Sequence, residues 1–355
     1  MNIFQAIFAF SLTIASSFVD GLPSTLSETT HHAVLSLDNE TVSFDVREGA
    51  KYSQPLNRQL INLSIEFCFI VDFLGDVGNL NLFSKQLLRN IEDRAGVAPI
   101  IRIGGNTADS SYFCRDCNET LVNVYGAENT EAVKTTYNQR LFEVLEEYDS
   151  GITRCPDKLS VAQAEIEAST KCLDQSYFYS YELGNEVNIY QYTGHRDNNW
   201  TVLSYAADTL QWLPTLVQLT KMNVPQAMGA VKSFSSHAYP QNVCSEPAAA
   251  LVTLDYYLNH LNTIQFFSAW ESEIAAGKSV GADFHIGVAG SAACHGKDGV
   301  SNTMAALLWE IDYALYAATV GVDRIFFHNG VGDFYYSMWE PVAVNSSSLA
   351  HINPT

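Results

Sequence analysis

The residues best suited to chemistry lie at the end of one short apolar run. Residues 178–186 read Phe-Tyr-Ser-Tyr-Glu-Leu-Gly-Asn-Glu, a buried strand that ends in Gly184, Asn185 and Glu186. In a barrel of parallel strands the carboxyl ends of the strands face the catalytic mouth, so a glutamate there is positioned for acid–base work. Cleavage of a glycosidic bond needs a carboxylic acid to protonate the leaving oxygen, and a retaining enzyme needs a second carboxylate about 5 Å away. The asparagine would hold the sugar 2-hydroxyl; a strand cap with a solvated glutamate is the alternative.

The rest of the chain supplies the elements that would position such a site. After residue 60, buried apolar runs alternate with helical patterns, which is typical of parallel βα units. The strand-like runs are residues 61–73, 99–103, 178–186, 231–239, 284–288 and 324–328. A complete barrel of this kind has eight strands. A further strand is expected within 151–172, and one βα unit is expected to be shortened or absent between Glu186 and Val231.

The first 60 residues differ in character from the barrel region. Residues 1–21 contain an apolar run that resembles a secretory signal peptide, so the protein is expected to be secreted and extracellular. Residues 22–60 alternate between apolar and polar side chains and predict part of a β appendage. Residues 61–341 would form the barrel, and 342–355 would begin a C-terminal segment.

Composition and charge exclude several classes of partner. A formal net charge of -20 over 355 residues argues against binding to nucleic acid or to anionic membrane surfaces. No stretch after the leader approaches the ~20 apolar residues of a membrane span. Asn-X-Ser/Thr sequons, which become glycan acceptors in a secreted chain, begin at Asn39, Asn62, Asn118, Asn199 and Asn345.

The seven cysteines favour disulfides in an oxidising compartment, and the odd number leaves at least one thiol unpaired or paired outside the chain. Cys68 lies inside an apolar run and is predicted to be the buried free thiol. Cys114 and Cys117 lack a second pair at metal-ligand spacing, so one disulfide or two separate bridges is favoured over zinc. Cys244 and Cys294 each follow a predicted strand by a few residues and are expected to pair. No metal or cofactor is expected.

Several motifs together resemble fungal members of glycoside hydrolase family 79, the β-glucuronidase and heparanase-like group. They are Ser-Ile-Glu-Phe at 64–67, Arg-Ile-Gly-Gly-Asn-Thr at 102–107, Glu-Leu-Gly-Asn-Glu at 182–186, Ser-Ser-His-Ala-Tyr-Pro at 235–240, Asp-Gly-Val-Ser-Asn-Thr at 298–303 and Phe-His-Asn-Gly at 327–330. The resemblance runs from about Ser64 to Pro341. It implies an α/β fold, a (β/α)8 TIM barrel with a β-sandwich appendage, and retaining action on β-linked glucuronides. Here the barrel is expected to be incomplete, and 22–60 to be the remnant of the sandwich.

The resemblance also implies roles for individual residues. Glu186 matches the general acid/base, and Asn185 matches its partner at the sugar 2-hydroxyl. Asp109 matches an acidic residue that helps to hold the sugar, and Tyr239 an aromatic residue near the nucleophile. A structural polar residue in a loop is the alternative for each of them, and His237 is expected to be a wall residue.

The chain departs from the family pattern at the nucleophile. Val288 occupies the place of the nucleophilic carboxylate, and an isopropyl group cannot form a glycosyl-enzyme bond. After the last strand, Gly332 is followed by Asp333 where the family has an aromatic residue, and that carboxylate would repel the substrate carboxylate. The chain also ends soon after its last strand.

These observations predict a secreted glycoside hydrolase-family protein that resembles retaining β-glucuronidases and whose activity is weak or lost. The alternative is a non-catalytic glycan-binding or interaction protein on the same fold, and a third reading is an incomplete gene product. The expected ligand is a β-glucuronide-type glycan. With the partner carboxylate absent and burial remaining, the pKa of Glu186 is expected to be raised.

Overall fold

The structure is a computed structural model that describes residues 9–15, 30–37, 40–47, 55–127, 129–148, 152–154, 159–172, 178–219, 231–342 and 349–353. The chain divides into two compact units. One contains residues 1–16 and 57–355, and the other contains residues 17–56.

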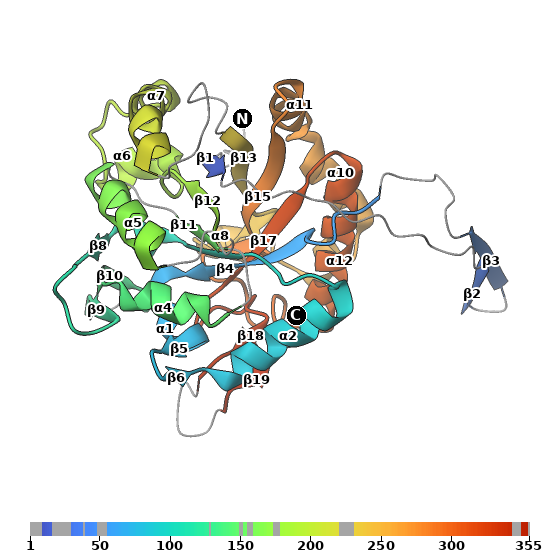
Figure 1. The fold of residues 1–355 in the computed structure, drawn as a ribbon. Helices are drawn as coiled ribbons and strands as arrows, with labels where there is room; N and C mark the ends of the chain where they lie inside the picture. The colour runs from blue at the N-terminus through green and yellow to red at the C-terminus, as the bar shows by residue number, and fades with distance from the viewer. Residues whose placement is uncertain are drawn as a thin grey trace. The chain divides into compact units, whose positions relative to one another are not determined.

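The larger unit is built on a curled sheet of parallel strands (Figure 1). Its strands are β4 (Ile61–Glu66), β7 (Ile101–Gly104), β11 (Ile152–Arg154), β12 (Phe178–Glu182), β13 (Val231–Ala238), β15 (Asp283–Ala289) and β17 (Arg324–Asn329). They lie in the order β12-β11-β7-β4-β17-β15-β13, with parallel pairing throughout. The predicted strand runs are therefore present, and the weak third strand is the short β11.

The eighth place in the sheet is taken by a strand of opposite direction. β1 (Ala9–Ala15) pairs antiparallel with both β12 and β13 and closes the sheet into a barrel. Between β12 and β13 the described residues contain helices and no strand, as the sequence predicted for a shortened unit. β1 lies within the predicted leader, so a molecule that has lost residues 1–21 would lack this strand. Amino-terminal sequencing of the mature protein distinguishes the two states.

Helices surround the sheet (Figure 1). They are η1 (Phe67–Phe69), α1 (Ile70–Leu74), α2 (Leu82–Ala95), α3 (Asn106–Asp109), α4 (Arg140–Glu146), α5 (Leu159–Cys172), η3 (Val187–Ile189), α6 (Tyr190–Thr193), α7 (Val202–Leu219), α8 (Glu246–Ala249), α9 (Leu254–Tyr257), α10 (His260–Ser268), α11 (Glu271–Ser279) and α12 (Met304–Thr319). α2 shows why such helices start and stop: the Asn81 side chain accepts from the backbone of Ser84, and Gly96 ends the helix in the left-handed conformation. None of the described helices is long and apolar enough to cross a membrane.

Alternation along the strands separates the apolar core from a polar interior. In β4, Leu63 and Ile65 join the core under the helices, whereas Ser64 and Glu66 fall on the opposite face. Trp309 of α12 belongs to a second buried apolar cluster. Burial of each such apolar side chain stabilises the fold by about 1.5–3 kcal/mol. This stabilisation offsets the cost of keeping polar side chains inside the barrel.

Short strands and disulfides organise the loops. The short strands are β5 (Gly75–Asp76), β6 (Asn79–Leu80), β8 (Ser111–Phe113), β9 (Leu121–Tyr125), β10 (Ala132–Tyr137), β14 (Gln241–Asn242), β16 (Ala292–Ala293), β18 (Trp339–Glu340) and β19 (His351–Ile352). Of these, β8, β9 and β10 form a three-stranded sheet inserted after β7. Disulfides join Cys114 to Cys117 and Cys244 to Cys294, and Cys68 is a buried free thiol. These three cysteine predictions are confirmed.

The smaller unit contains one antiparallel hairpin among the residues described. Its strands are β2 (Thr30–Leu37) and β3 (Glu40–Arg47). Ala33 lies opposite Phe44 and Leu35 lies opposite Val42. Two apolar pairs from the alternating pattern therefore face one another across the hairpin.

The predicted glycan acceptors differ in their exposure to solvent. Asn62 is fully buried, and its side chain bonds the backbone of Ile100 and Gln59, so its sequon is inaccessible in the folded chain. Asn118 and Asn199 are exposed. The remaining two sequons, at positions 39 and 345, lie outside the described residues.

The buried carboxyl of Glu310 in α12 makes stability depend on pH. Burial raises the pKa of Glu310 from 4.5 to about 8. The contribution of this carboxyl to folding stability is therefore fully present below pH 4.5 and is lost as pH rises through 8. We expect Glu310→Gln to raise the free energy of unfolding at pH 8 by on the order of 4 kcal/mol and to change it little at pH 4.5. Urea titrations at both pH values measure this, with the exposed Glu119→Gln as the control. An equal gain at both pH values would contradict the prediction.

Candidate functional site

The polar interior of the barrel is organised around Arg102 of β7. Its side chain is 1% exposed, and its Nε donates to Glu182 Oε2 at 2.5 Å. Its Nη1 donates to Ser64 Oγ at 3.1 Å, and its Nη2 donates to Asn185 Oδ1 at 3.0 Å. The same Nη2 lies 3.2 Å from His237 Nε2. One guanidinium therefore joins β4, β7, β12 and β13 at the level where Asn185 follows its strand.

Glu186 stands directly after this network in an unusual backbone conformation. Its φ of 41° and ψ of 48° lie in the left-handed region, which costs a residue with a side chain roughly 1–2 kcal/mol. Its side chain is 21% exposed, and its Oε1 lies 3.2 Å from His237 Nδ1. Such backbone conformations concentrate at functional sites, because surrounding contacts must hold them.

The two hydrogen bonds of His237 define its protonation. Arg102 has no acceptor atoms, so its Nη2 donates to an unprotonated Nε2, and the ring proton lies on Nδ1, where it is donated to Glu186. Burial and the charge of Arg102 lower the pKa of His237, although the hydrogen bond to Glu186 acts the other way. His237 is therefore a neutral donor that points its proton at Glu186.

The pKa of Glu186 is lowered, so the predicted rise is wrong. Burial acts to raise it, but the hydrogen bond with His237 comes first among the effects that lower it, followed by the electrostatic effects of His237, His328 and Arg102, and together these outweigh burial. The sequence could not show this, because His237 lies 51 positions along the chain. Glu186 is therefore a carboxylate near neutral pH in the free protein.

The His237 contact is testable by titration. We expect His237→Phe to move the pKa of Glu186 upward, above the ordinary 4.5, because burial remains when the donor is lost. Carbon-detected NMR titration of the glutamate carboxyl carbons measures the shift. His260→Phe, at an exposed histidine, should leave the Glu186 signal in place. A Glu186 titration that is identical in wild type and His237→Phe would show that His237 has no such effect.

Asp109 and Tyr190 hold the loop that carries Asn185. The backbone N–H of Asn185 is shared between Asp109 Oδ1 at 3.2 Å and the Tyr190 hydroxyl oxygen at 3.1 Å, and that hydroxyl donates to Asp109 at 2.8 Å. The Asn185 amide also donates to Asn106 Oδ1. Asp109 is 4% exposed and acts here as a support for the loop. Its predicted contact with a sugar stays a prediction.

Val288 lies beside His237 on the neighbouring strand. In the register of β13 and β15, Ser236 pairs with Ile286 and His237 pairs with Val288, so Gly287 is the extra residue of a bulge. Residues paired across neighbouring strands point to the same face of the sheet. Val288, which is 3% exposed, therefore lies on the face where His237 contacts Glu186.

Two other carboxylates on this face are engaged elsewhere. Glu182 bonds Arg102, and Glu66 accepts from the backbone and hydroxyl of Thr107 and bonds His328 Nε2 at 3.1 Å. Burial acts to raise the pKa of Glu66, but His328 and Thr107 outweigh it and lower the pKa. Both carboxylates are 1% exposed. Neither offers an accessible second carboxylate beside Glu186.

The aromatic residues that accompany Glu186 are Tyr239 and Tyr336. Their rings lie 6.1 Å apart, and burial, Tyr336 and Glu186 raise the pKa of Tyr239. Gly332 donates its backbone N–H to Glu340 instead, and the predicted binding residue Asp333 is exposed. This loop places Tyr336, three residues after Asp333, against Tyr239.

No family model matches the chain. A curated β-glucuronidase from Aspergillus niger is 25% identical over 90% of this chain and 67% of its own length. One from Neurospora crassa is 24% identical over 87% of this chain and 63% of its own length, so the chain spans about two-thirds of these relatives.

The chain is similar to curated β-glucuronidases. The resemblance to family 79 inferred from the motifs is confirmed. A solved structure shares the fold of this chain: a 4-O-α-L-rhamnosyl-β-D-glucuronidase from Fusarium oxysporum 12S in complex with Rha-GlcA. Its TM-score is 0.70, with 21% identity over 81% of this chain and 66% of that one.

The candidate site also contains a second histidine–glutamate pair that the sequence did not reveal. His295, from the loop after β15, bonds Glu131 at 2.8 Å and stacks on Phe334 with ring centroids 4.0 Å apart. Glu131 precedes β10 of the inserted sheet. The pair therefore joins that sheet to the loops after β15 and β17, over more than 160 positions of sequence.

Proposed function

We propose that this chain is a secreted protein that recognises β-linked glucuronides and hydrolyses them weakly, if at all. One observation carries the proposal: the strand register pairs Val288 with His237, whose ring contacts Glu186. This contact supports an arrangement in which Glu186, the proposed acid/base, and Val288, at the proposed nucleophile position, both lie near His237. The substrate class is supported by the relatives, which are β-glucuronidases.

The chemistry of the site supports binding more strongly than cleavage. A retaining mechanism needs two carboxylates about 5–5.5 Å apart, and Val288 supplies none. The lowered pKa of Glu186 leaves it ionised at neutral pH, so it is a poor proton donor. Tyr239 and Tyr336, whose pKa values are raised, keep their hydroxyl protons and can donate to an anionic sugar.

Calorimetric titration with methyl β-D-glucuronide tests the proposed binding. We expect a Kd below about 1 mM for the unmodified protein. Asn185→Ala should bind at least tenfold more weakly, because it removes the amide group that would form a hydrogen bond with the sugar. Asn118→Ala, at an exposed asparagine, serves as the control. Absence of binding, or equal weakening by both variants, would refute the proposal.

Secretion is tested separately. Expressed in a eukaryotic host, the protein should accumulate in the medium and begin near residue 22. Peptide mapping should find glycans at the exposed Asn118 and Asn199 and none at the buried Asn62. Retention in the cells with Met1 intact would contradict this part of the proposal.

A further inference from the structure

An exposed apolar stripe runs along helix α12, on the outside of the barrel. Figure 1 shows α12 beside α10, and the two helices pack together through Phe267 and Tyr313, whose ring centroids lie 4.7 Å apart. Between residues 304 and 318, every position that is exposed to solvent is apolar. These positions, which we call the α12 stripe, are Met304, Leu308, Ile311 and Leu315, with exposed fractions of 59%, 52%, 45% and 47%.

The two acidic residues of α12 do not interrupt the α12 stripe. Glu310 is buried, with 5% of its surface exposed. Asp312 is bonded to His260 Nδ1 and to Thr263 Oγ1, both at 2.7 Å. The helix contains no lysine or arginine. A helix that is apolar on every face is normally buried on every face, so the α12 stripe is expected to be covered by another element.

The spacing of the α12 stripe fits a second copy of the same helix. Its members are separated by four, three and four positions, the spacing of the a and d positions along a coiled-coil seam. The order four, three, four is the same in both directions of the chain. Two antiparallel copies of α12 therefore bring Met304 of each chain opposite Leu315 of the other. The same arrangement places Leu308 opposite Ile311, and a two-fold axis relates all these contacts.

The exposed apolar area is sufficient for a stable pair. The neighbouring helices α9 and α10 add three leucines, Leu254, Leu258 and Leu261, with exposed fractions of 41%, 56% and 68%. Full burial of a leucine-sized side chain removes on the order of 100 Å² of apolar surface, so seven side chains that are about half exposed leave on the order of 400 Å². Each partner of a standard interface contributes about 800 Å², of which somewhat more than half is apolar. The α12 stripe and these leucines therefore match the apolar part of one side of such an interface.

Charge also favours contact at this surface. The chain carries a formal net charge of -20, so two copies repel one another over most of their surfaces. The four side chains of the α12 stripe are uncharged, so their contact removes no carboxylate from water. We propose that α12 pairs with α12 of a second copy in antiparallel orientation and makes the protein a two-fold dimer. The proposal does not depend on the proposed glucuronide binding, because Asn185 and Glu186 follow β12, whereas α12 lies between β15 and β17 in the chain.

Sedimentation equilibrium of the full-length protein tests the pairing. We expect a dimer with a Kd below about 10 μM, since interfaces of standard size range from micromolar to picomolar. Leu308→Glu and Ile311→Lys should each weaken it by about 100-fold or more, because each places a charge in the apolar contact. Both side chains are about half exposed, so the folded chain tolerates the changes, and thermal melts establish that each variant is folded.

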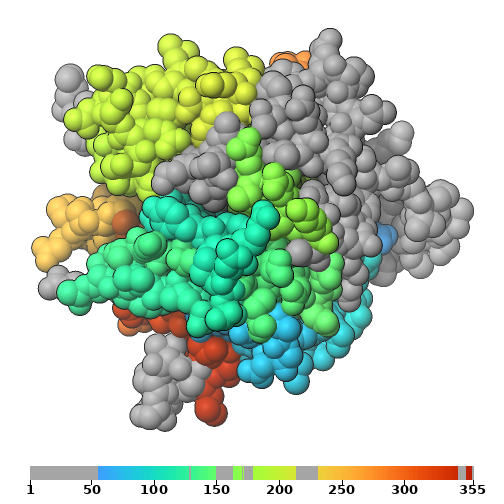
Figure 2. Space-filling model, turned by 60° about the vertical axis from the view of Figure 1, so that its left-hand side comes forward, coloured from blue at the N-terminus to red at the C-terminus, as the bar shows by residue number. Residues whose placement is uncertain are grey.

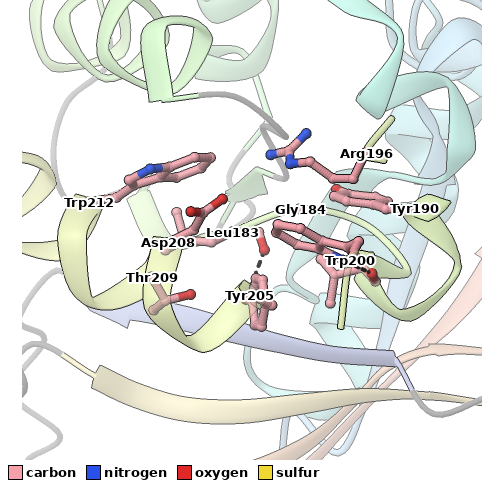
Figure 3. Close-up of a pocket in the computed structure, with 10 residues that line it drawn as sticks. Leu183, Gly184, Tyr190, Arg196, Trp200, Tyr205, Asp208, Thr209 and Trp212 are labelled. Atoms are coloured by element: carbon pink, nitrogen blue, oxygen red, sulfur yellow. Dashed lines mark hydrogen bonds between the residues drawn. The ribbon is translucent and has the colours of Figure 1, made fainter. Parts of the chain in front are cut away.

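A leucine on another helix supplies the matched control. Leu203 is 81% exposed on α7, which Figure 2 shows at the surface in yellow-green. Other contacts hold α7 on the barrel: the Tyr205 hydroxyl donates to the backbone of Leu183 at 2.9 Å (Figure 3). The cavity between α7 and that segment measures about 10 Å³, room for about one water molecule, so the helix is closely packed there. Leu203→Glu should leave the dimer unchanged.

A mixture of two variants tests the antiparallel register. Leu308 of one copy faces Ile311 of the other, so Leu308→Glu chains mixed with Ile311→Lys chains should form a dimer about tenfold tighter, or more, than either variant alone. A parallel pair would place Leu308 opposite Leu308 and would show no such recovery. A protein that stays monomeric at about 100 μM would assign the α12 stripe to a different partner and overturn the inference. It is also overturned if Leu308→Glu and Ile311→Lys leave the dimer intact, if Leu203→Glu weakens it equally, or if mixing restores nothing.

Discussion

Val288→Glu is expected to raise the hydrolysis of aryl β-glucuronides by roughly two orders of magnitude or more over the unmodified protein. The new carboxylate would occupy the strand position paired with His237, beside Glu186. It would supply the nucleophile, and its charge would push the pKa of Glu186 upward, toward the protonated form that an acid catalyst needs. Both missing functions would thus be restored by one substitution.

Steady-state rates with a nitrophenyl β-glucuronide measure this effect, and two variants control it. Val288→Gln has the same size without charge and should remain inactive. Val288→Glu combined with Glu186→Gln should lose the gain, because the acid is removed. If the unmodified protein already turns over the substrate at about 1 s⁻¹ or faster and Val288→Gln does not impair it, then Val288 does not stand at the nucleophile position.

Six of the barrel strands could be predicted from the sequence, because buried strand-like runs alternate with helical patterns. β11 was the weak case because it contains three residues, too few to show any period. The gap between β12 and β13 could be recognised as a missing strand. That β1 fills this gap could not be predicted, because the sequence of an apolar segment such as 9–15 does not show which strands it will pair with.

Only those residues of the candidate site that belong to the sequence motifs could be predicted. Glu186 and Asn185 stand where the strand ending placed them, and Val288 lies on the face assigned to the nucleophile position. Contacts between distant segments decided the rest. His237 reverses the expected pKa shift of Glu186, and Tyr336 packs against Tyr239.

Arg102→Met is expected to lower the free energy of unfolding by about 3–5 kcal/mol, which corresponds to a fall in melting temperature of roughly 10 °C. The substitution preserves the length of the side chain but leaves the carboxylate of Glu182 buried at 1% exposure without its cation. Ser64 and Asn185 lose a donor at the same time. Chemical denaturation at pH 7 measures the loss, and Arg115→Met, at an exposed pair with Glu167, is the matched control.

The double variant Arg102→Met with Glu182→Met distinguishes an ion pair from simple packing. Removing both charges leaves no uncompensated ion, so the double variant should be more stable than Arg102→Met alone, and the cycle should show strong coupling. The deficit of the single variant should also shrink toward pH 5, because the isolated Glu182 carboxyl would have a raised pKa and take up a proton as pH falls. Additive losses that are equal at pH 5 and pH 7 would mean that Arg102 stabilises the barrel through its volume and not through its charge.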